Sequence, residues 1–187
     1  MVCFPVTIGR GYTSVSEVKT NKLSSVSTNG NLTIQPNGTG LIVPKRTVAF
    51  QVQASDTDQS IGNVATKVEW ESVELDTGSY WDSTNNRYTP QIAGWYQFGG
   101  VIRFNVSSVM KYANAAIYKN GALFFRHQLQ LTNDEINNGG IPLPTGLVQL
   151  NGSSDYVEAF AQFDHTTTVH DTTTTKSVFF GILVHGT

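Results

Sequence analysis

Residues 94–104 read GWYQFGGVIRF, and this stretch decides the fold. Apolar side chains alternate along it as they do in a β-strand, where successive side chains point to opposite faces. One face consists of Tyr96, Phe98, Ile102 and Phe104. The opposite face consists of Trp95, Gln97, Val101 and Arg103. The first face is therefore predicted to belong to a hydrophobic core, whereas the second is only half apolar.

Short apolar or alternating runs recur along the chain between Gly, Pro and Asn turns, while helical periodicity is hard to find. The composition agrees, since 11% of the 187 residues are aromatic and 17 are glycine. The chain is therefore predicted to be all-β, a sandwich or a barrel. Strands are expected near residues 31–35, 40–43, 47–53, 64–75, 86–89, 94–105, 112–119, 122–131, 145–150, 154–163 and 177–184.

The last of these segments, residues 177–184, reads SVFFGILV and is apolar on both faces. A strand that is buried on both sides implies a second layer beyond the sandwich core. In a protein with two sheets, the simplest such layer is another copy of the chain. The predicted subunit interface consists of Trp95, Phe179 and Leu183.

Aromatic residues upstream of residue 94 extend the pattern over a longer signature. Its members are Trp70, Asp76, Trp81, Tyr88, Gly94, Tyr96 and Phe98. Their order and spacing resemble the signature of C1q-like domains, which belong to the wider C1q and tumour-necrosis-factor group. Trp70 and Tyr88 stand where that family usually has phenylalanine, and Gly100 stands where a final aromatic residue is expected.

The resemblance continues downstream and spans Val48 to Val184. Residues 116–121 (AIYKNG) resemble the family's Lys-Asn-Gly turn, residues 150–157 (LNGSSDYV) the start of a later strand, and residues 179–183 (FFGIL) its closing strand. Lys-Asn-Gly also suits a tight hairpin that needs positive φ. The resemblance implies a ten-stranded jelly-roll sandwich at residues 46–187, assembled as a homotrimer around a threefold axis.

Residues 1–45 differ from the rest, because their apolar residues are too sparse for an independent core. Residues 29–44 read NGNLTIQPNGTGLIVP, a strand, turn and strand, and resemble a repeat common in tail fibres and other appendages of bacteriophages. We expect a short extended β-segment that anchors the chain or forms a stem. A disordered tail is the alternative.

Charge and cysteine content limit the possible partners. The net charge of −2, with Lys and Arg scattered singly, gives no basic stripe for nucleic acid. No run approaches the roughly 20 apolar residues of a membrane helix, and the N-terminus lacks a secretory signal. Cys3 is the only cysteine, so no intrachain disulfide forms, which fits synthesis in a cytoplasm. Cys3 itself is interpreted as a packing residue or a free thiol.

Polar clusters offer several candidate sites. Residues 164–171 are predicted to form a receptor-contact loop through Asp164, His165, His170 and Asp171. His165 and His170 are also the candidate ligands of a transition metal on the threefold axis, although no tight His-x-His spacing is present. Calcium is a second alternative, with Asp56, Asp58 and Asp76 as its ligands.

A sugar-stacking platform is a further alternative. Its candidate residues are Tyr80, Trp81, Trp95 and Tyr112. No Gly-x-Ser-x-Gly, His-Glu-x-x-His or phosphate-binding glycine loop occurs, and the acidic pair at 134–135 lies in a polar stretch. The chain is therefore predicted to have no enzymatic activity and no cofactor.

Together these features predict a trimeric virion structural protein of a bacteriophage, made in the host cytoplasm and displayed on the virion surface. Residues 1–45 would bind other virion proteins, and the C1q-like heads would attach to a cell-surface glycan or protein. A tail fibre and a capsid decoration or head fibre both fit. The alternatives are a capsid cement protein without receptor binding, and a secreted C1q/TNF-like ligand, against which the missing signal argues.

Overall fold

The computed structural model describes residues 47–187 except 55–57, 106–108, 136–138 and 170–175. The chain divides into two units, Met1–Val43 and Pro44–Thr187, and every described residue belongs to the second. The predicted anchoring segment at residues 1–45 and Cys3 lie outside the described residues. Among the described residues there is no helix with the length and apolarity that crossing a bilayer requires.

The described residues form thirteen strands in two sheets. The seven-stranded sheet contains β1 (Ala49–Gln53), β2 (Gln59–Ile61), β4 (Ser72–Asp76), β7 (Gly94–Asn105), β10 (Gly139–Leu150), β12 (Thr167–Val169) and β13 (Val178–Gly186). The six-stranded sheet contains β3 (Thr66–Lys67), β5 (Trp81–Asp82), β6 (Arg87–Tyr88), β8 (Val109–Lys119), β9 (Ala122–Glu135) and β11 (Val157–Phe163). All pairings are antiparallel, as in a sandwich built from hairpins and Greek keys.

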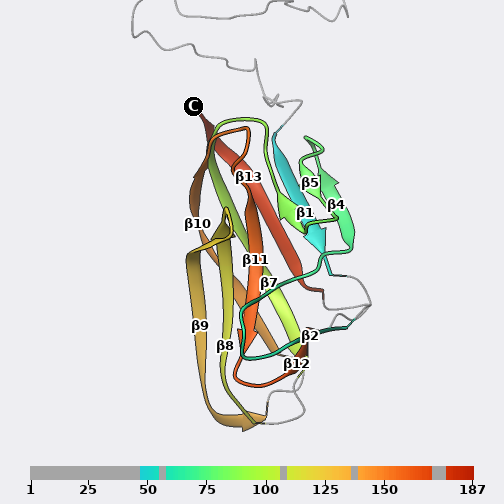
Figure 1. Ribbon diagram of the computed structural model, residues 1–187, viewed down its shortest axis with the longest axis vertical. Helices are drawn as coiled ribbons and strands as arrows, with labels where there is room; N and C mark the ends of the chain where they lie inside the picture. Colours follow the sequence, from blue (N-terminus) through green and yellow to red (C-terminus); the bar gives the residue numbers. More distant parts are fainter. Residues whose placement is uncertain (1–46, 55–57, 106–108, 136–138, 170–175) are drawn as a thin grey trace, which may run out of the picture. The chain divides into compact units, whose positions relative to one another are not determined.

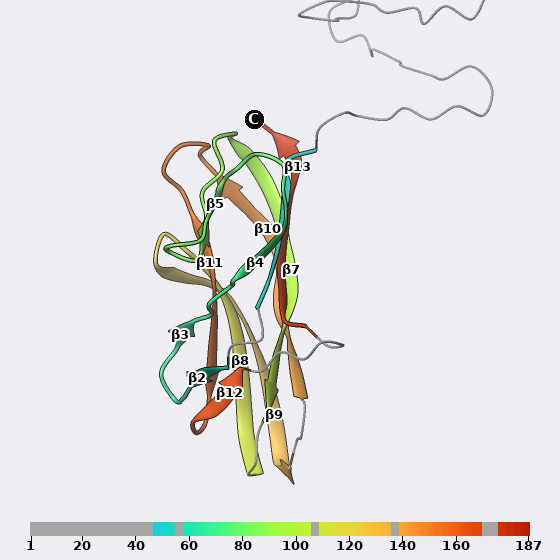
Figure 2. The same cartoon turned by 90° about the vertical axis from the view of Figure 1, so that its right-hand side faces the viewer.

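The two sheets form two layers, with β7 and β13 in one and β3 and β11 in the other (Figure 2). In the first layer β13 lies between β1 and β7, and β10 pairs with the other edge of β7. β1 begins at the end of the sandwich where β13 finishes, because Ala49 pairs with Ile182 (Figure 1). The described head therefore begins, at Thr47, at the same end of the sandwich as the C-terminus.

The sequence prediction of strands succeeds where apolar alternation is long. The expected strand at 94–105 is β7 with the same bounds. β2, β5 and β12 were not predicted because two or three residues are too few to show alternation. The strand count implied by the resemblance, ten, is not reproduced, since the described residues form thirteen strands.

β10 is longer than the expected strand at 145–150. It begins at Gly139 and includes two prolines, Pro142 and Pro144, which the sequence prediction left outside the strand. Proline cannot donate a hydrogen bond to a neighbouring strand, so it is tolerated at the edge of a sheet. β10 pairs only with β7 and lies at such an edge. A bulge between Leu143 and Gly146 accompanies the second proline.

Aromatic rings fill the space between the sheets. The ring of Phe50 stacks on that of Tyr88, with centroids 4.1 Å apart, and meets the ring of Phe179 edge-on at 5.1 Å. These three residues are at most 1% exposed. The rings of Trp70, Trp81, Tyr96 and Phe98 pack around them. Six of the seven residues of the sequence signature are therefore core aromatics or the glycine at the start of β7, and the seventh, Asp76, forms a turn described below.

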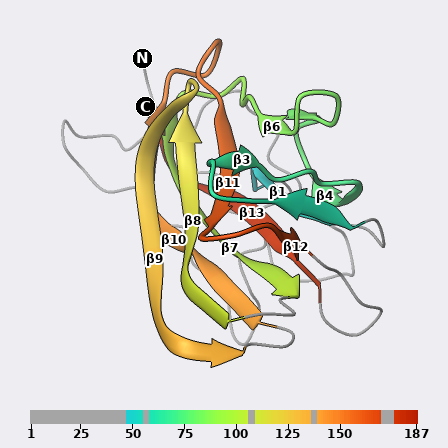
Figure 3. The same ribbon diagram turned by 60° about the horizontal axis from the view of Figure 1, so that its bottom comes forward.

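The Lys-Asn-Gly turn joins β8 to β9, which form a long curved hairpin (Figure 3). Asn120 and Gly121 have φ of 54° and 76°, so the turn needs the left-handed backbone that the sequence predicted. Asn120 also accepts a hydrogen bond from the backbone N–H of Tyr156 at 2.9 Å and donates one to Asp155 at 2.7 Å. This turn is thus fixed to the segment that leads into β11.

Two buried tyrosines provide a test of the core. The Tyr96 hydroxyl donates to the carbonyl of Ile92 at 2.8 Å, whereas the Tyr88 hydroxyl is buried without a hydrogen-bond partner among the described residues. We expect Tyr96→Phe to lower the free energy of unfolding at pH 7 by about 1 kcal/mol. Tyr88→Phe should leave it unchanged or raise it slightly, as measured by urea denaturation. A larger loss for Tyr88→Phe than for Tyr96→Phe would contradict this packing.

The same tyrosines make the fold sensitive to alkali. Burial raises the pKa of Tyr96 to about 12 and also raises that of Tyr88. Above pH 10 the unfolded chain releases protons that the folded chain keeps, so the free energy of unfolding falls as pH rises, by up to about 1.4 kcal/mol per pH unit for each tyrosine. Tyr88→Phe should make this decline between pH 10 and 12 shallower. Equal slopes for wild type and variant would exclude Tyr88 as a cause.

Candidate functional site

The outward face of the seven-stranded sheet carries a row of apolar side chains across neighbouring strands. The register places Phe180 of β13 between Gln51 of β1 and Gly99 of β7. Two residues further along β13, Ile182 lies between Ala49 of β1 and Gln97 of β7. Leu147 of β10 pairs with the other side of Gln97. We call this surface the β13 face. Its exposed apolar residues are Leu75, Trp95, Leu147, Phe180, Ile182 and Val184.

The exposure of these side chains is large for residues in the middle of a sheet. Phe180 and Ile182 are each 37% exposed, and Val184 is 55% exposed. A Cβ on Gly99 would lie 2.9 Å from the Phe180 ring, so the ring fits over β7 because residue 99 is a glycine. Exposed apolar side chains grouped on one sheet face make this surface a candidate interaction site, because monomeric proteins rarely expose large apolar patches.

The sequence prediction chose the wrong face of the last strand. Phe179 is fully buried in the core, so the prediction that it belongs to the subunit interface is wrong. Leu183 is partly buried and packs against that core, and its role in an interface stays a prediction. The residues that face outward are their neighbours Phe180, Ile182 and Val184. Trp95, the third predicted interface residue, does lie outward and is 39% exposed. Both faces of the strand are apolar, so the sequence pattern could not show which one points inward.

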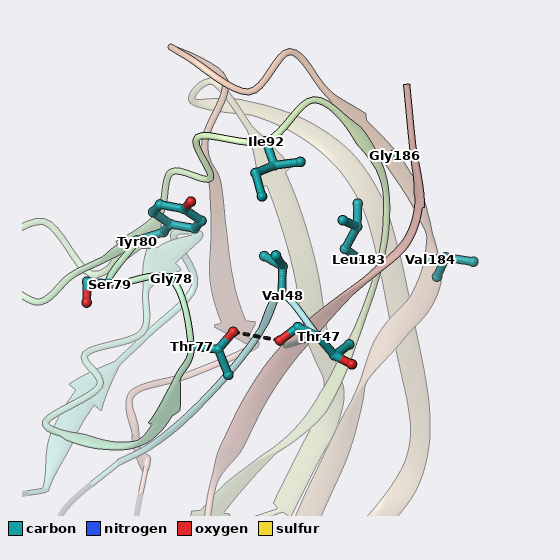
Figure 4. Close-up of a pocket in the computed structure, with 10 residues that line it drawn as sticks. All are labelled: Thr47, Val48, Thr77, Gly78, Ser79, Tyr80, Ile92, Leu183, Val184 and Gly186. Atoms are coloured by element: carbon teal, nitrogen blue, oxygen red, sulfur yellow. Dashed lines mark hydrogen bonds between the residues drawn. The ribbon is translucent and has the colours of Figure 1, made fainter. Parts of the chain in front are cut away.

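A pocket of about 560 Å³ lies where β1 begins and β13 ends (Figure 4). Leu183 points toward Val48 and Ile92 in this pocket, whereas Val184 points away from it. The Thr77 hydroxyl donates to the carbonyl of Thr47 at 2.7 Å across one side. Tyr80 carries the one ionisable side chain among the lining residues. The described residues that line the pocket include no pair of carboxylates and no histidine.

The predicted receptor loop at 164–171 is not a single exposed loop. Its middle forms β12, in which Thr167 and Val169 are buried. The Asp164 carboxylate accepts a hydrogen bond from the backbone N–H of Lys111 at 2.8 Å and lies 2.9 Å from Nδ1 of His165. Asp164 therefore ties the start of this segment to β8. His170 and Asp171 lie outside the described residues.

The proposed metal and calcium ligands are also distributed differently from the prediction. Asp76 accepts hydrogen bonds from the backbone N–H groups of Gly78 and Trp81, at 3.3 and 2.8 Å, and so forms the turn between β4 and β5. Asp58 is exposed near β2, while Asp56 and His170 lie outside the described residues. Over the part of the chain that the structure describes, no three His, Cys, Asp or Glu side chains gather as a metal site.

The aromatic residues predicted to form a sugar platform do not lie together. Trp81 and Tyr80 pack against the core, and Trp95 lies on the β13 face. Tyr112 belongs to β8 in the other sheet. The sequence could not reveal this separation, because it does not show which of the two sheets each aromatic residue belongs to.

Comparison with solved structures shows which known folds this chain resembles. No family model matches the sequence, and no curated protein matches it. The chain resembles solved structures of murine APRIL at pH 5.0 (TM-score 0.56, 12% identity, 74% of this chain and 100% of that chain). It also resembles the globular domain of zebrafish complement 1qA protein (TM-score 0.54, 12% identity, 74% of this chain and 98% of that chain). The described all-β sandwich is therefore a C1q/TNF-like jelly roll, as the sequence resemblance implied.

The role of Asp76 leads to a stability test. Asp76→Ala removes the acceptor for two backbone N–H groups, and we expect it to lower the free energy of unfolding by about 1–2 kcal/mol. Glu69→Ala removes an exposed acid nearby and is the matched control, with a loss below about 0.5 kcal/mol. Adding calcium should change neither value. Stabilisation of the wild type by calcium that Asp76→Ala abolishes would favour the ligand role instead.

Proposed function

We propose that this chain is a non-catalytic, homotrimeric virion structural protein of a bacteriophage, attached through residues 1–45 and presenting C1q-like heads for host attachment. The observation that carries the proposal is the β13 face. Three copies that bury this face around a common axis remove its apolar side chains from water. The ends of the sandwiches and the outer surface of the six-stranded sheet remain available for other contacts.

The arrangement of strands supports burial of the β13 face rather than pairing along a sheet edge. β10 forms one edge of the seven-stranded sheet and contains Pro142 and Pro144, which interrupt the donors that an added strand would need. Association through the face, in contrast, uses side chains that are already exposed. Each apolar side chain of this size contributes on the order of 1 kcal/mol when its remaining surface is buried. A trimer repeats that gain at three interfaces.

The location in a virion rests on the sequence of residues 29–44, which resembles bacteriophage appendage repeats. The start of β1 is compatible with an N-terminal attachment, because the described head begins at Thr47, at one end of the sandwich. Three identical heads would also bind a repetitive cell-surface glycan by avidity, so weak single sites suffice.

Two alternatives keep the trimer but change its use. A capsid cement protein would clamp neighbouring capsid subunits and bind no receptor. A secreted ligand module is favoured by the likeness to murine APRIL and to zebrafish complement 1qA protein, whose fold this chain shares. Particles stripped of the protein distinguish these functions. Loss of adsorption supports attachment, heat-fragile capsids with normal adsorption support cement, and absence of the protein from particles excludes a virion role.

The trimer is tested by sedimentation of the full chain and of Ile182→Lys. At micromolar concentration we expect the wild type to have three times the 20.4 kDa mass of one chain. Ile182→Lys places an ammonium group in the β13 face, so the trimer dissociation constant should rise at least tenfold.

The matched control for this variant is Val64→Lys. Val64 is 70% exposed and lies between β2 and β3, outside the β13 face. It should sediment as the wild type does. A wild-type monomer, or dissociation by Val64→Lys as strong as that by Ile182→Lys, would overturn the proposed interface.

A further inference from the structure

A second candidate surface lies on the outward side of the six-stranded sheet, away from the β13 face. The rings of Tyr118 in β8 and Phe160 in β11 stack with centroids 4.0 Å apart and planes inclined by 23°. Both residues are half-buried, and Leu123, which pairs with Tyr118, is 50% exposed beside them. Aromatic and aliphatic carbon therefore forms a small apolar platform on an otherwise polar sheet surface.

A shallow depression of about 40 Å³ adjoins this platform. Its volume is close to the roughly 30 Å³ that one water molecule occupies in the liquid, so it accepts a single hydroxyl or hydroxymethyl group rather than a whole ring. Three of its lining residues are polar, namely Asn114, Arg126 and Gln162, and none is acidic. The ligand must therefore lie over the platform and place one polar group in the depression.

Asn114 supplies the second observation. Its side chain is 6% exposed, and its Nδ2 donates to Oε1 of Gln162 at 3.0 Å. The amide of Gln162 is itself fixed, since its Nε2 donates to the carbonyl of Asn63 at 2.8 Å. This chain of bonds orients Asn114 and leaves its Oδ1 buried without a hydrogen-bond partner among the described residues. A buried acceptor of this kind is costly unless a donor reaches it.

Arg126 provides donors at the other side of the depression. It pairs with Ala116 across the β8–β9 ladder, and its side chain is exposed. Ala116 is small, and Arg126, Tyr118 and Phe160 line the same depression. The surface thus combines an apolar face, an unpaired acceptor and a group with several N–H donors. A pyranose sugar has the matching parts, namely an apolar C–H face, hydroxyl donors and oxygen acceptors.

We propose that the surface formed by Asn114, Tyr118, Leu123, Arg126, Phe160 and Gln162 binds a pyranose residue of a surface polysaccharide. The sugar ring lies on the Tyr118–Phe160 platform. One of its hydroxyl groups donates to Oδ1 of Asn114, and other ring or hydroxyl oxygens accept from Arg126. The inference rests on the proposed attachment function and gives it a ligand class and a site.

The test uses the full chain and methyl pyranosides of glucose, galactose, mannose, rhamnose and N-acetylglucosamine. Saturation-transfer NMR should show binding of at least one of them, with a dissociation constant on the order of 1–10 mM. Its C–H protons on one ring face should receive the strongest saturation. Absence of binding by all five up to about 50 mM would mean that water alone fills the depression, and would overturn the proposal.

Variants then locate the site. Arg126→Ala and Asn114→Leu should each raise the dissociation constant about tenfold, the usual effect of losing a hydrogen bond to a buried or charged group. Asn114→Leu keeps the side-chain volume and removes the unpaired acceptor, but it also removes the hydrogen bond to Gln162, so its thermal midpoint is measured beside its affinity to show that the variant is folded. Gln128→Ala, two residues from Arg126 on the same face of β9, is the matched control and should bind as the wild type does. Equal binding by Arg126→Ala and Gln128→Ala would overturn the site.

Adsorption of particles to cells separates this inference from the proposed function. If particles adsorb through the protein but Arg126→Ala and Asn114→Leu adsorb normally, the saccharide site is wrong and the attachment function stands. If the sugar binds as expected and the variants weaken binding, but particles that lack the protein adsorb normally, the site stands and the attachment function is wrong.

Discussion

The rings of Phe50, Tyr88 and Phe179 hold the two sheets together, and the rest of the head depends on their packing. Side chains in a regular strand alternate, so the inward position of Phe179 fixes the directions of its neighbours in β13 as far as Leu183, where the register with β7 shifts. Gly181, the next inward position, has no room for a Cβ because the rings of Phe50 and Phe98 lie 2.6 Å from where it would stand. Phe180 and Ile182 must then face outward, and the β13 face follows from the core.

The two outward surfaces of the sandwich differ in chemistry, and we propose that they differ in use. The β13 face is apolar across β4, β13, β7 and β10, which suits permanent contact with identical copies. The outer side of the six-stranded sheet carries the Tyr118–Phe160 pair beside the polar residues Asn114, Arg126 and Gln162, which suits weak and reversible contact with a sugar. Because the two surfaces lie on opposite layers, assembly leaves the second one open.

Much of the fold was predictable from the sequence, because a long alternating strand and ordered aromatic spacing are both local signals. β7 was predicted to the residue, and the Asn120–Gly121 turn was recognised from its backbone requirement. Less of the candidate site was predictable. Phe179 and Phe180 are equivalent in the sequence, and only the packing against Phe50 distinguishes them. Tyr118 and Phe160 are distant in the chain and become neighbours through the β8–β11 register, so no sequence pattern links them.

Electron cryo-microscopy of the full chain in solution tests the central claim most directly, since it shows which surface of the head is covered. The account predicts three copies around one axis, with Phe180 and Ile182 of each copy buried against a neighbour and the Tyr118–Phe160 platform facing solvent. Single heads, or an assembly in which the β13 face is open to water, would contradict it.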